Sequence, residues 1–319
     1  MIAARYAETG GSGVLEVGEV ETPQPGPGEV LVRLAVAGVN PTDWKARAGA
    51  TGPLNFDFQV PGQDGAGVIE AVGEGVAKAW KGERVWVYLA GWQSPWGTAA
   101  EYTVVPVEKA VPLGDASFEL GASLGVPALT AYHCLFSDGP IEGKRVLVAG
   151  GAGAVGHGAI ELAKWGGAEV ITTVSSAEKA ELASAADVIV NYREPGAAEQ
   201  IGKVDRIVEV ALGPNLELDL VVANPHATIV TYAADQPSAE LPVRAAMTAN
   251  LTFRFMLLYT IPEPSKHDAI GGVSKAVEAG ALTVLPLHRF PLAETAAAHD
   301  AVENGAVGKV VIDTSSSDG

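Results

Sequence analysis

Apolar and polar positions follow two different rhythms along the chain, and the change comes near residue 120. Before it, short apolar runs such as "EVLVRLAVAGVN" (29–40) and "RVWVYLA" (84–90) stand between turns rich in glycine and proline, such as "PQPGPGE" (23–29). Helical periodicity is scarce in this part. The pattern predicts a mostly β region made of short strands.

After residue 120, buried runs of valine and isoleucine alternate with segments of helical spacing. The runs include "RVLVAG" (145–150), "EVITTV" (169–174), "DRIVEVA" (205–211) and "ATIVTYA" (227–233). Continuous apolar strands that alternate with helices are typical of a parallel sheet covered on both faces. Two further helical patterns and the run "GKVVIDT" follow, and the closing "SSSDG" is expected to fray.

Composition narrows the class of protein. A chain of 319 residues that is 48% hydrophobic can bury two cores, so we expect two domains. It has no apolar run of membrane-spanning length, and "MIAARYAETGG" lacks the features of a signal peptide, so a cytoplasmic protein is expected. Cys134 is the single cysteine, which excludes a disulfide framework. The net charge of −17 disfavours nucleic acid as a partner.

The stretch "AGGAGAVGHGAIELAKWGG" (149–167) joins a predicted strand to a predicted helix through a glycine-rich turn. Three of its glycines fit G-x-G-x-x-G, in which the glycines allow a tight turn, close approach of a pyrophosphate and close helix–strand packing. The helix N-terminus then offers N–H donors to the phosphates. The context favours dinucleotide binding over a merely structural turn, and the candidate residues are Gly151, Gly153, Ala154, Val155 and Gly156.

The next predicted strand decides between the two nicotinamide dinucleotides. An NAD site places a carboxylate at the end of this strand, whereas this chain has Ser175 and Ser176 there, followed by Lys179. Glu169 stands at the wrong end of the strand. Hydroxyls and an ammonium suit a 2′-phosphate, so NADPH is the expected cofactor. The serines can equally cap the next helix, with Lys179 on a solvated face.

Several segments together resemble the zinc-independent branch of the medium-chain dehydrogenase/reductase superfamily, close to NADPH:quinone oxidoreductases. Besides the glycine turn they are "AGVNPTDWKARAG" (37–49), "VPGQDGAGVI" (60–69), "VPALTAY" (126–132), "SSAEKAEL" (175–182), "VNYRE" (190–194), "FPLAETAAAH" (290–299) and "GKVVI" (308–312). The resemblance implies an α/β protein with a GroES-like, mostly β catalytic domain over 1–121 and 259–319. A Rossmann domain with a doubly wound parallel sheet is expected over 122–258.

The same resemblance suggests residues for the site. Asn40 is expected to line the nicotinamide pocket, with Lys45 on the following loop and Thr130 at the nicotinamide end. Lys45 stands where many quinone reductases have tyrosine, and a solvent-facing charge is an equal alternative. Thr130 could instead bond within its helix. Further cofactor contacts are expected from Tyr192, Val210, Ala211, Ala233, Met256 and Leu257, although Tyr192 could be an ordinary strand-end aromatic.

The resemblance also bears on metal chemistry. Zinc-dependent relatives hold catalytic zinc at positions that match Asn40, Gln63 with Asp64, and Val126. Tetrahedral catalytic zinc needs three protein ligands, and the cysteine and histidine positions are lost here. The six histidines show no paired spacing, and no four-cysteine lobe is present. We expect a metal-free enzyme.

Without a Lewis acid, a hydride acceptor must need little activation. Quinones and α,β-unsaturated carbonyls qualify because the charge spreads to an oxygen that hydrogen bonds can hold. Reduction of quinones or enones is therefore expected. An enoyl or alkenal double-bond reductase and a non-catalytic NADPH-binding structural or redox-sensing protein are the alternatives.

The run "ANLTFRFMLLYT" (249–260) is β-prone and comes late in the predicted Rossmann sheet, where a doubly wound sheet has an edge. An apolar edge strand needs a cover. Relatives pair this strand across a two-fold axis, so the resemblance implies a homodimer with Arg254 and Phe255 near the junction. Cover by the chain's own C-terminal helix is the alternative.

Overall fold

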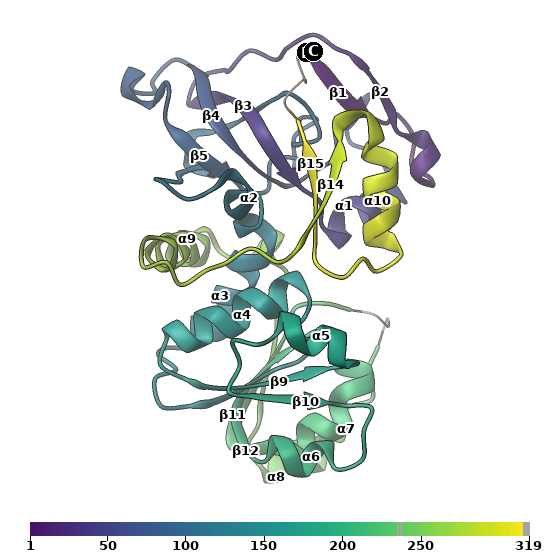
Figure 1. Ribbon diagram of the computed structural model, residues 1–319, viewed down its shortest axis with the longest axis vertical. Coiled ribbons are helices and arrows are strands. Elements are labelled where there is room, and N and C mark those ends of the chain that lie inside the picture. The colour runs from purple at the N-terminus through teal and green to yellow at the C-terminus, as the bar shows by residue number, and fades with distance from the viewer. Residues whose placement is uncertain (235, 237, 315–319) are drawn as a thin grey trace. The chain divides into compact units, whose positions relative to one another are not determined.

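The computed structural model describes residues 1–234, 236 and 238–314, and the expected fraying of 315–319 lies outside these residues. The chain divides into two compact units, 1–126 with 286–319 and 127–285. Figure 1 shows a mostly β unit and an α/β unit, which are described separately below. No helix among the described residues is long and apolar enough to cross a membrane.

The first unit is built on a seven-stranded sheet in the order β14–β15–β3–β4–β5–β7, with β6 also paired to β3, and a separate two-stranded sheet. Its strands are β1 (Ile2–Arg5), β2 (Glu16–Glu19), β3 (Glu29–Gly38), β4 (Asp64–Val72), β5 (Arg84–Val87), β6 (Tyr102–Pro106), β7 (Ala110–Pro112), β14 (Leu287–Pro291) and β15 (Lys309–Asp313). Its helices are α1 (Pro41–Arg47), α2 (Phe118–Gly121) and α10 (Thr295–Glu303). The end of the chain returns to this sheet because β15 pairs antiparallel with β3.

The second unit is a six-stranded parallel sheet in the order β10–β9–β8–β11–β12–β13. Its strands are β8 (Arg145–Val148), β9 (Glu169–Val174), β10 (Val188–Asn191), β11 (Val204–Glu209), β12 (Ala223–Thr231) and β13 (Thr252–Phe255). Its helices are α3 (Leu129–Phe136), α4 (Ala154–Trp165), α5 (Ala177–Leu182), α6 (Ala197–Ile201), α7 (Leu212–Val222), α8 (Val243–Thr248) and α9 (Glu263–Glu278).

The order of these six strands is that of a doubly wound Rossmann sheet, with the switch point between β8 and β11. Helices α3 and α4 lie on one face, whereas α6 and α7 lie on the other (Figure 1). Leu147, Ile171, Ile207 and Ile229 belong to the core between the sheet and its helices. The expected fold class, a GroES-like β domain and a Rossmann domain, is confirmed.

The boundaries between the units differ from the expected ones. Helix α9 belongs to the α/β unit, although its segment was expected in the catalytic domain. It packs against α3, and a Cβ on Gly272 would meet the Tyr132 ring at 2.0 Å. This close approach is a tertiary contact that neither segment shows in its own periodicity.

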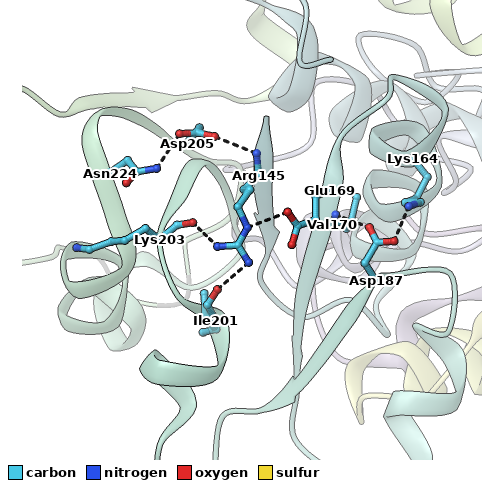
Figure 2. A network of polar contacts seen from close by, with 9 residues as sticks. All are labelled: Arg145, Lys164, Glu169, Val170, Asp187, Ile201, Lys203, Asp205 and Asn224. Atoms are coloured by element: carbon cyan, nitrogen blue, oxygen red, sulfur yellow. Dashed lines mark hydrogen bonds and ion pairs between the residues drawn. The ribbon is translucent and has the colours of Figure 1, made fainter. Parts of the chain in front are cut away.

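A polar network ties together the amino-terminal ends of β8, β9 and β11 (Figure 2). Arg145 Nε lies 3.0 Å from Glu169 Oε2, and Arg145 Nη1 donates to the Lys203 carbonyl at 2.6 Å. The Arg145 backbone N–H donates to Asp205 Oδ2 at 2.9 Å. Ligands of open parallel sheets bind at the opposite, carboxyl ends of the strands. Glu169 therefore has a structural partner here, at the opposite end of β9 from its carboxyl end.

Candidate functional site

The turn between β8 and α4 owes its shape to glycines with different roles. Gly150 takes the left-handed conformation, with φ of 71°. A Cβ on Gly151 would meet Thr172 Oγ1 at 2.1 Å, and one on Gly156 would meet the Gly150 carbonyl at 2.3 Å. Side chains at Gly151 and Gly156 are thus excluded by the protein's own packing.

Gly153 differs from its neighbours in this turn. It is exposed, it has an extended backbone (φ −79°, ψ 161°), and the nearest atom to an added Cβ is 3.5 Å away. It forms the N-cap of α4, where the N–H groups of Ala154, Val155 and Gly156 have no partner within the helix. A bare surface beside free N–H donors fits a pyrophosphate, and nothing in the fold itself requires a glycine at this place.

The carboxyl ends of β9 and β10 lie side by side because Val174 pairs with Asn191. This brings Ser175, Ser176 and Lys179 into the same corner as "YR" (192–193). Ser176 Oγ accepts the Lys179 N–H at 3.3 Å, so Ser176 caps α5, as one of the two alternatives predicted. Tyr192 is half-exposed, and the Arg193 guanidinium lies 6.0 Å from its ring centroid. Sequence reasoning did not single out Arg193, which adds a second cation to this corner.

The loop after β11, where Val210 and Ala211 were expected to border the cofactor, is held by a buried acidic pair. Glu209 accepts the Ala211 N–H, and it accepts Asn215 Nδ2 at 2.9 Å. The neighbouring Asp219 carboxyl is also buried. Burial, followed by the charge of Glu209, raises the pKa of Asp219 to about 8, so Asp219 is protonated at neutral pH. The sequence carried no signal for this pair.

The remaining candidates of the α/β unit lie beyond other strand ends or on α3. The Ala233 carbonyl, just past β12, accepts Thr231 Oγ1 at 3.3 Å. Met256, just past β13, donates its N–H to the Thr231 carbonyl at 3.0 Å, and Leu257 is half-exposed. Thr130 is buried in α3, one residue after its start.

In the β unit, side chains from distant parts of the sequence meet at Asn40. Asn40 Nδ2 donates to Asp64 Oδ2 at 2.6 Å, and Lys309 Nζ donates to Asn40 Oδ1 at 2.9 Å. Asp64 Oδ1 accepts the Val126 N–H at 2.8 Å. Asp43, on the first turn of α1, accepts the Asn40 backbone N–H at 2.7 Å. The side chains of Asn40, Asp43, Asp64 and Lys309 are all buried, and we call these four residues the Asn40 cluster.

Burial governs protonation in the Asn40 cluster. It raises the pKa of Asp43 to about 7, and the charge of Asp64 adds to this effect. It raises the pKa of Asp64 to about 6, against the opposing influence of the Lys309 ammonium. Burial also lowers the pKa of Lys309, which the two carboxylates counteract. The Lys309 ammonium thus opposes the neutral form that burial favours in both carboxyl groups.

The structure brings together the positions that resemble a zinc site, but with other residue types. Asn40, Asp64 and Val126 share the contacts above, and the Gln63 backbone N–H helps to lower the pKa of Asp43. Within residues 1–234, 236 and 238–314, no three His, Cys, Asp or Glu side chains are placed to hold a metal ion. Lys45 lies apart from the cluster contacts, partly exposed, with Nζ 5.8 Å from the Trp44 ring centroid.

Comparisons with known proteins agree with this architecture. Residues 26–115 match the alcohol dehydrogenase GroES-like domain, and residues 184–312 match a zinc-binding dehydrogenase model. A quinone oxidoreductase of Lama guanicoe is 30% identical over 98% of this chain and 97% of its own. One from Pseudomonas aeruginosa is 31% identical over 92% of this chain and 94% of its own. The chain belongs to the quinone oxidoreductase family.

Membership of the quinone oxidoreductase family makes this protein an oxidoreductase of the medium-chain dehydrogenase/reductase type. A solved structure of a mycobacterial protein in complex with NADPH is 30% identical to it, with a TM-score of 0.83. That match covers 98% of this chain and 99% of the other. The resemblance stated from sequence motifs is therefore confirmed over nearly the whole length.

Proposed function

We propose that this protein uses NADPH to reduce a quinone or an α,β-unsaturated carbonyl by hydride transfer, without a metal ion. The observation that carries the proposal is the exposed Gly153 surface at the start of α4, beside the polar ends of β9 and β10. It is built for a diphosphate and an adjoining anionic group. NADPH, when bound, supplies the hydride from C4 of its nicotinamide.

The choice of NADPH over NADH rests on the corner formed by β9 and β10. No carboxylate stands at the end of β9 to bind a ribose 2′-OH, and Ser175, Lys179 and Arg193 offer donors to a phosphate. The Ser176 hydroxyl accepts from the Lys179 backbone, yet its own O–H can still donate. The mycobacterial relative solved with NADPH supports the same choice.

We expect Lys179→Ala to weaken NADPH binding by about 10- to 100-fold and to leave NADH binding nearly unchanged. A charge-assisted hydrogen bond to the 2′-phosphate is worth about 1.5–3 kcal/mol, and NADH has no such phosphate. Fluorescence titration with both dinucleotides measures the effect. Lys164→Ala is the control, because Lys164 pairs with Asp187 at 2.6 Å at the other end of the sheet. Equal losses of affinity for NADPH and NADH would show that Lys179 does not bind the 2′-phosphate.

The metal-free part of the proposal rests on the residue types of the Asn40 cluster. An amide, a glutamine and a backbone N–H stand at the positions where zinc-dependent relatives have ligands, and a lysine ammonium lies among them. A fixed ammonium next to Asp64 disfavours a second cation by charge repulsion. Purified protein is expected to contain less than stoichiometric zinc by elemental analysis and to keep its activity in chelators. One zinc per chain that survives dialysis would contradict this proposal.

The proposed substrate class follows from the described residues, which include no ligand set for a Lewis acid. Steady oxidation of NADPH in the presence of a panel of quinones, enones and enoyl thioesters tests it. Turnover of quinones and simple enones supports the proposal, whereas turnover confined to enoyl or alkenal substrates selects the double-bond reductase. NADPH binding without any turnover would select a non-catalytic role.

We also propose that the protein is a homodimer joined along β13. This strand lies at the edge of the six-stranded sheet, and Phe255, Met247 and Val243 near it are 75%, 70% and 59% exposed. An apolar sheet edge needs a cover, and a two-fold axis lets the same strand cover itself.

Light scattering at micromolar concentration is expected to give twice the chain mass. Phe253→Pro or Phe255→Pro removes a ladder donor and is expected to yield monomer or aggregate. Lys275→Ala, on the solvent side of α9, is expected to leave the dimer intact. A monomeric wild-type protein would contradict the proposed dimer.

A further inference from the structure

The Asn40 amide has an orientation that its neighbours dictate chemically. A lysine ammonium has only donors, so the Asn40 atom that faces Lys309 must be the oxygen. An ionised carboxylate has only acceptors, so the atom that faces Asp64 must be the nitrogen. The two contacts, 2.9 Å and 2.6 Å, therefore exclude the flipped amide independently of each other.

This arrangement leaves one specific group of Asn40 available. The oxygen accepts from Lys309, and among the described residues Asp64 is the only hydrogen-bond acceptor of Nδ2. An amide nitrogen carries two N–H donors, so the second N–H of Nδ2 remains for another acceptor. Because Asp64 and Lys309 hold the amide from both ends, the direction of that N–H is fixed before any ligand arrives.

We propose that Lys309 and Asp64 are positioning residues that lock the Asn40 amide so that its second N–H binds the oxygen of the hydride acceptor. The proposal rests on the proposed function. Hydride addition to a quinone or enone leaves an electron pair on the carbonyl oxygen, which becomes an enolate or phenolate oxygen. The locked N–H stabilises that charge, and the proton that completes the product comes from water.

The backbone around the cluster is shaped to admit these two side chains. A Cβ on Gly38 would lie 3.1 Å from Lys309 Cε and Nζ, and 2.0 Å from the Ala122 carbonyl. A Cβ on Gly125 would lie 2.1 Å from Asp64 Oδ1. Two glycines thus leave the room that the Lys309 and Asp64 side chains need to reach Asn40.

The cost of the cluster argues against a merely stabilising role. Burying charged groups is expensive, and replacing a buried ion pair with apolar residues is often neutral or stabilising. Lys309 also donates to the Val39 carbonyl at 3.3 Å. Within the described part of the chain, the ammonium therefore forms hydrogen bonds only with residues 39 and 40. The buried ammonium therefore orients the Asn40 side chain and the Val39 carbonyl next to it.

A double-mutant cycle tests the proposal. Lys309→Met keeps most of the side-chain volume and removes the donor, and Asn40→Ala removes the amide. We expect each single variant to lower kcat by about 100- to 1000-fold with an unchanged Kd for NADPH, as for loss of an oxyanion donor. Asn40→Ala with Lys309→Met together is expected to be no slower than Asn40→Ala alone, because Lys309 acts through the amide.

A second variant guards against failure to fold. Lys309→Met with Asp64→Asn together removes the buried ammonium and the carboxylate that faces it, so no new unpaired charge is created in that pair. It is expected to fold and to show the same low kcat. Lys266→Met removes a lysine of similar burial, held by Glu263 at 2.6 Å in the other unit, and is expected to keep the wild-type kcat.

The outcomes separate the two proposals. An inactive wild-type protein would contradict the proposed function, whereas an active wild type with a folded Lys309→Met of normal kcat would overturn the positioning role alone. Losses that multiply in the Asn40/Lys309 double variant would also overturn it, because they would show that Lys309 acts independently of the amide.

Discussion

Gly153→Val is expected to weaken NADPH binding by more than about 100-fold while the protein keeps its fold. The backbone at Gly153 is one that valine adopts readily, and the nearest protein atom to an added Cβ is 3.5 Å away. The branched side chain would instead fill the space against the first-turn N–H groups of α4, where the pyrophosphate must approach. Fluorescence titration gives the affinity, and thermal unfolding followed by circular dichroism reports the fold.

Two other glycines provide the comparison. Gly18→Val, in β2, where nothing lies within 4 Å of an added Cβ, is expected to leave both affinity and melting temperature unchanged. Gly156→Val is expected to fail in folding, because its Cβ would lie 2.3 Å from the Gly150 carbonyl. If Gly153→Val bound NADPH normally, the pyrophosphate would not lie on this surface.

Asp219→Asn is expected to make the protein more stable at alkaline pH and to flatten the fall of its stability with pH. Burial raises the pKa of Asp219 to about 8, whereas in the unfolded chain it is about 4. Between these values the folded state holds a proton that the unfolded state has lost. Stability therefore falls as pH rises through this interval, and it is highest below it.

Asparagine removes this titration and offers an N–H donor to Glu209 in place of the O–H of the protonated Asp219. The midpoint of urea unfolding, measured from pH 5 to pH 9, checks the expectation. Asp187→Asn is the comparison variant, because the pKa of Asp187 is shifted in the opposite direction: the nearby Lys164 ammonium lowers it at the surface. That variant is expected to lose about 0–1 kcal/mol at neutral pH. If the urea midpoints of Asp219→Asn and of the wild type changed with pH in parallel, the inference that Asp219 is buried and protonated would be wrong.

Local pattern was sufficient for much of the α/β unit. Strands such as β8 and β9 are continuous apolar runs, and the glycine turn between β8 and α4 combines a strand end with a helix start within a few residues. Such features depend on neighbouring residues, and the sheet order then follows from the doubly wound Rossmann fold that these alternating strands and helices indicate. The position of β13 at the sheet edge was predictable for the same reason.

Only the tertiary packing shows what surrounds each residue of a motif. The motif gives its three glycines different roles, but only the packing shows which atoms exclude a side chain. Thr172 does so at Gly151 and the Gly150 carbonyl at Gly156, whereas Gly153 is left open. The sequence pattern also gave no indication that Glu209 and Asp219 form a buried acidic pair. A strand end and a helix position become a pair only when α7 packs beside β11.

By itself, the sequence determined the two fold types and the glycine turn, and it singled out Asn40 as a candidate, because each depends on residues close together or on motifs with a known resemblance. Only the tertiary structure decided what surrounds Asn40. Lys309 is 269 residues away and reaches it because β15 pairs with β3, with the Val39 N–H bonded to the Val310 carbonyl at 3.0 Å. Strand register over such a separation depends on the packing of the whole sheet, and no local pattern contains it.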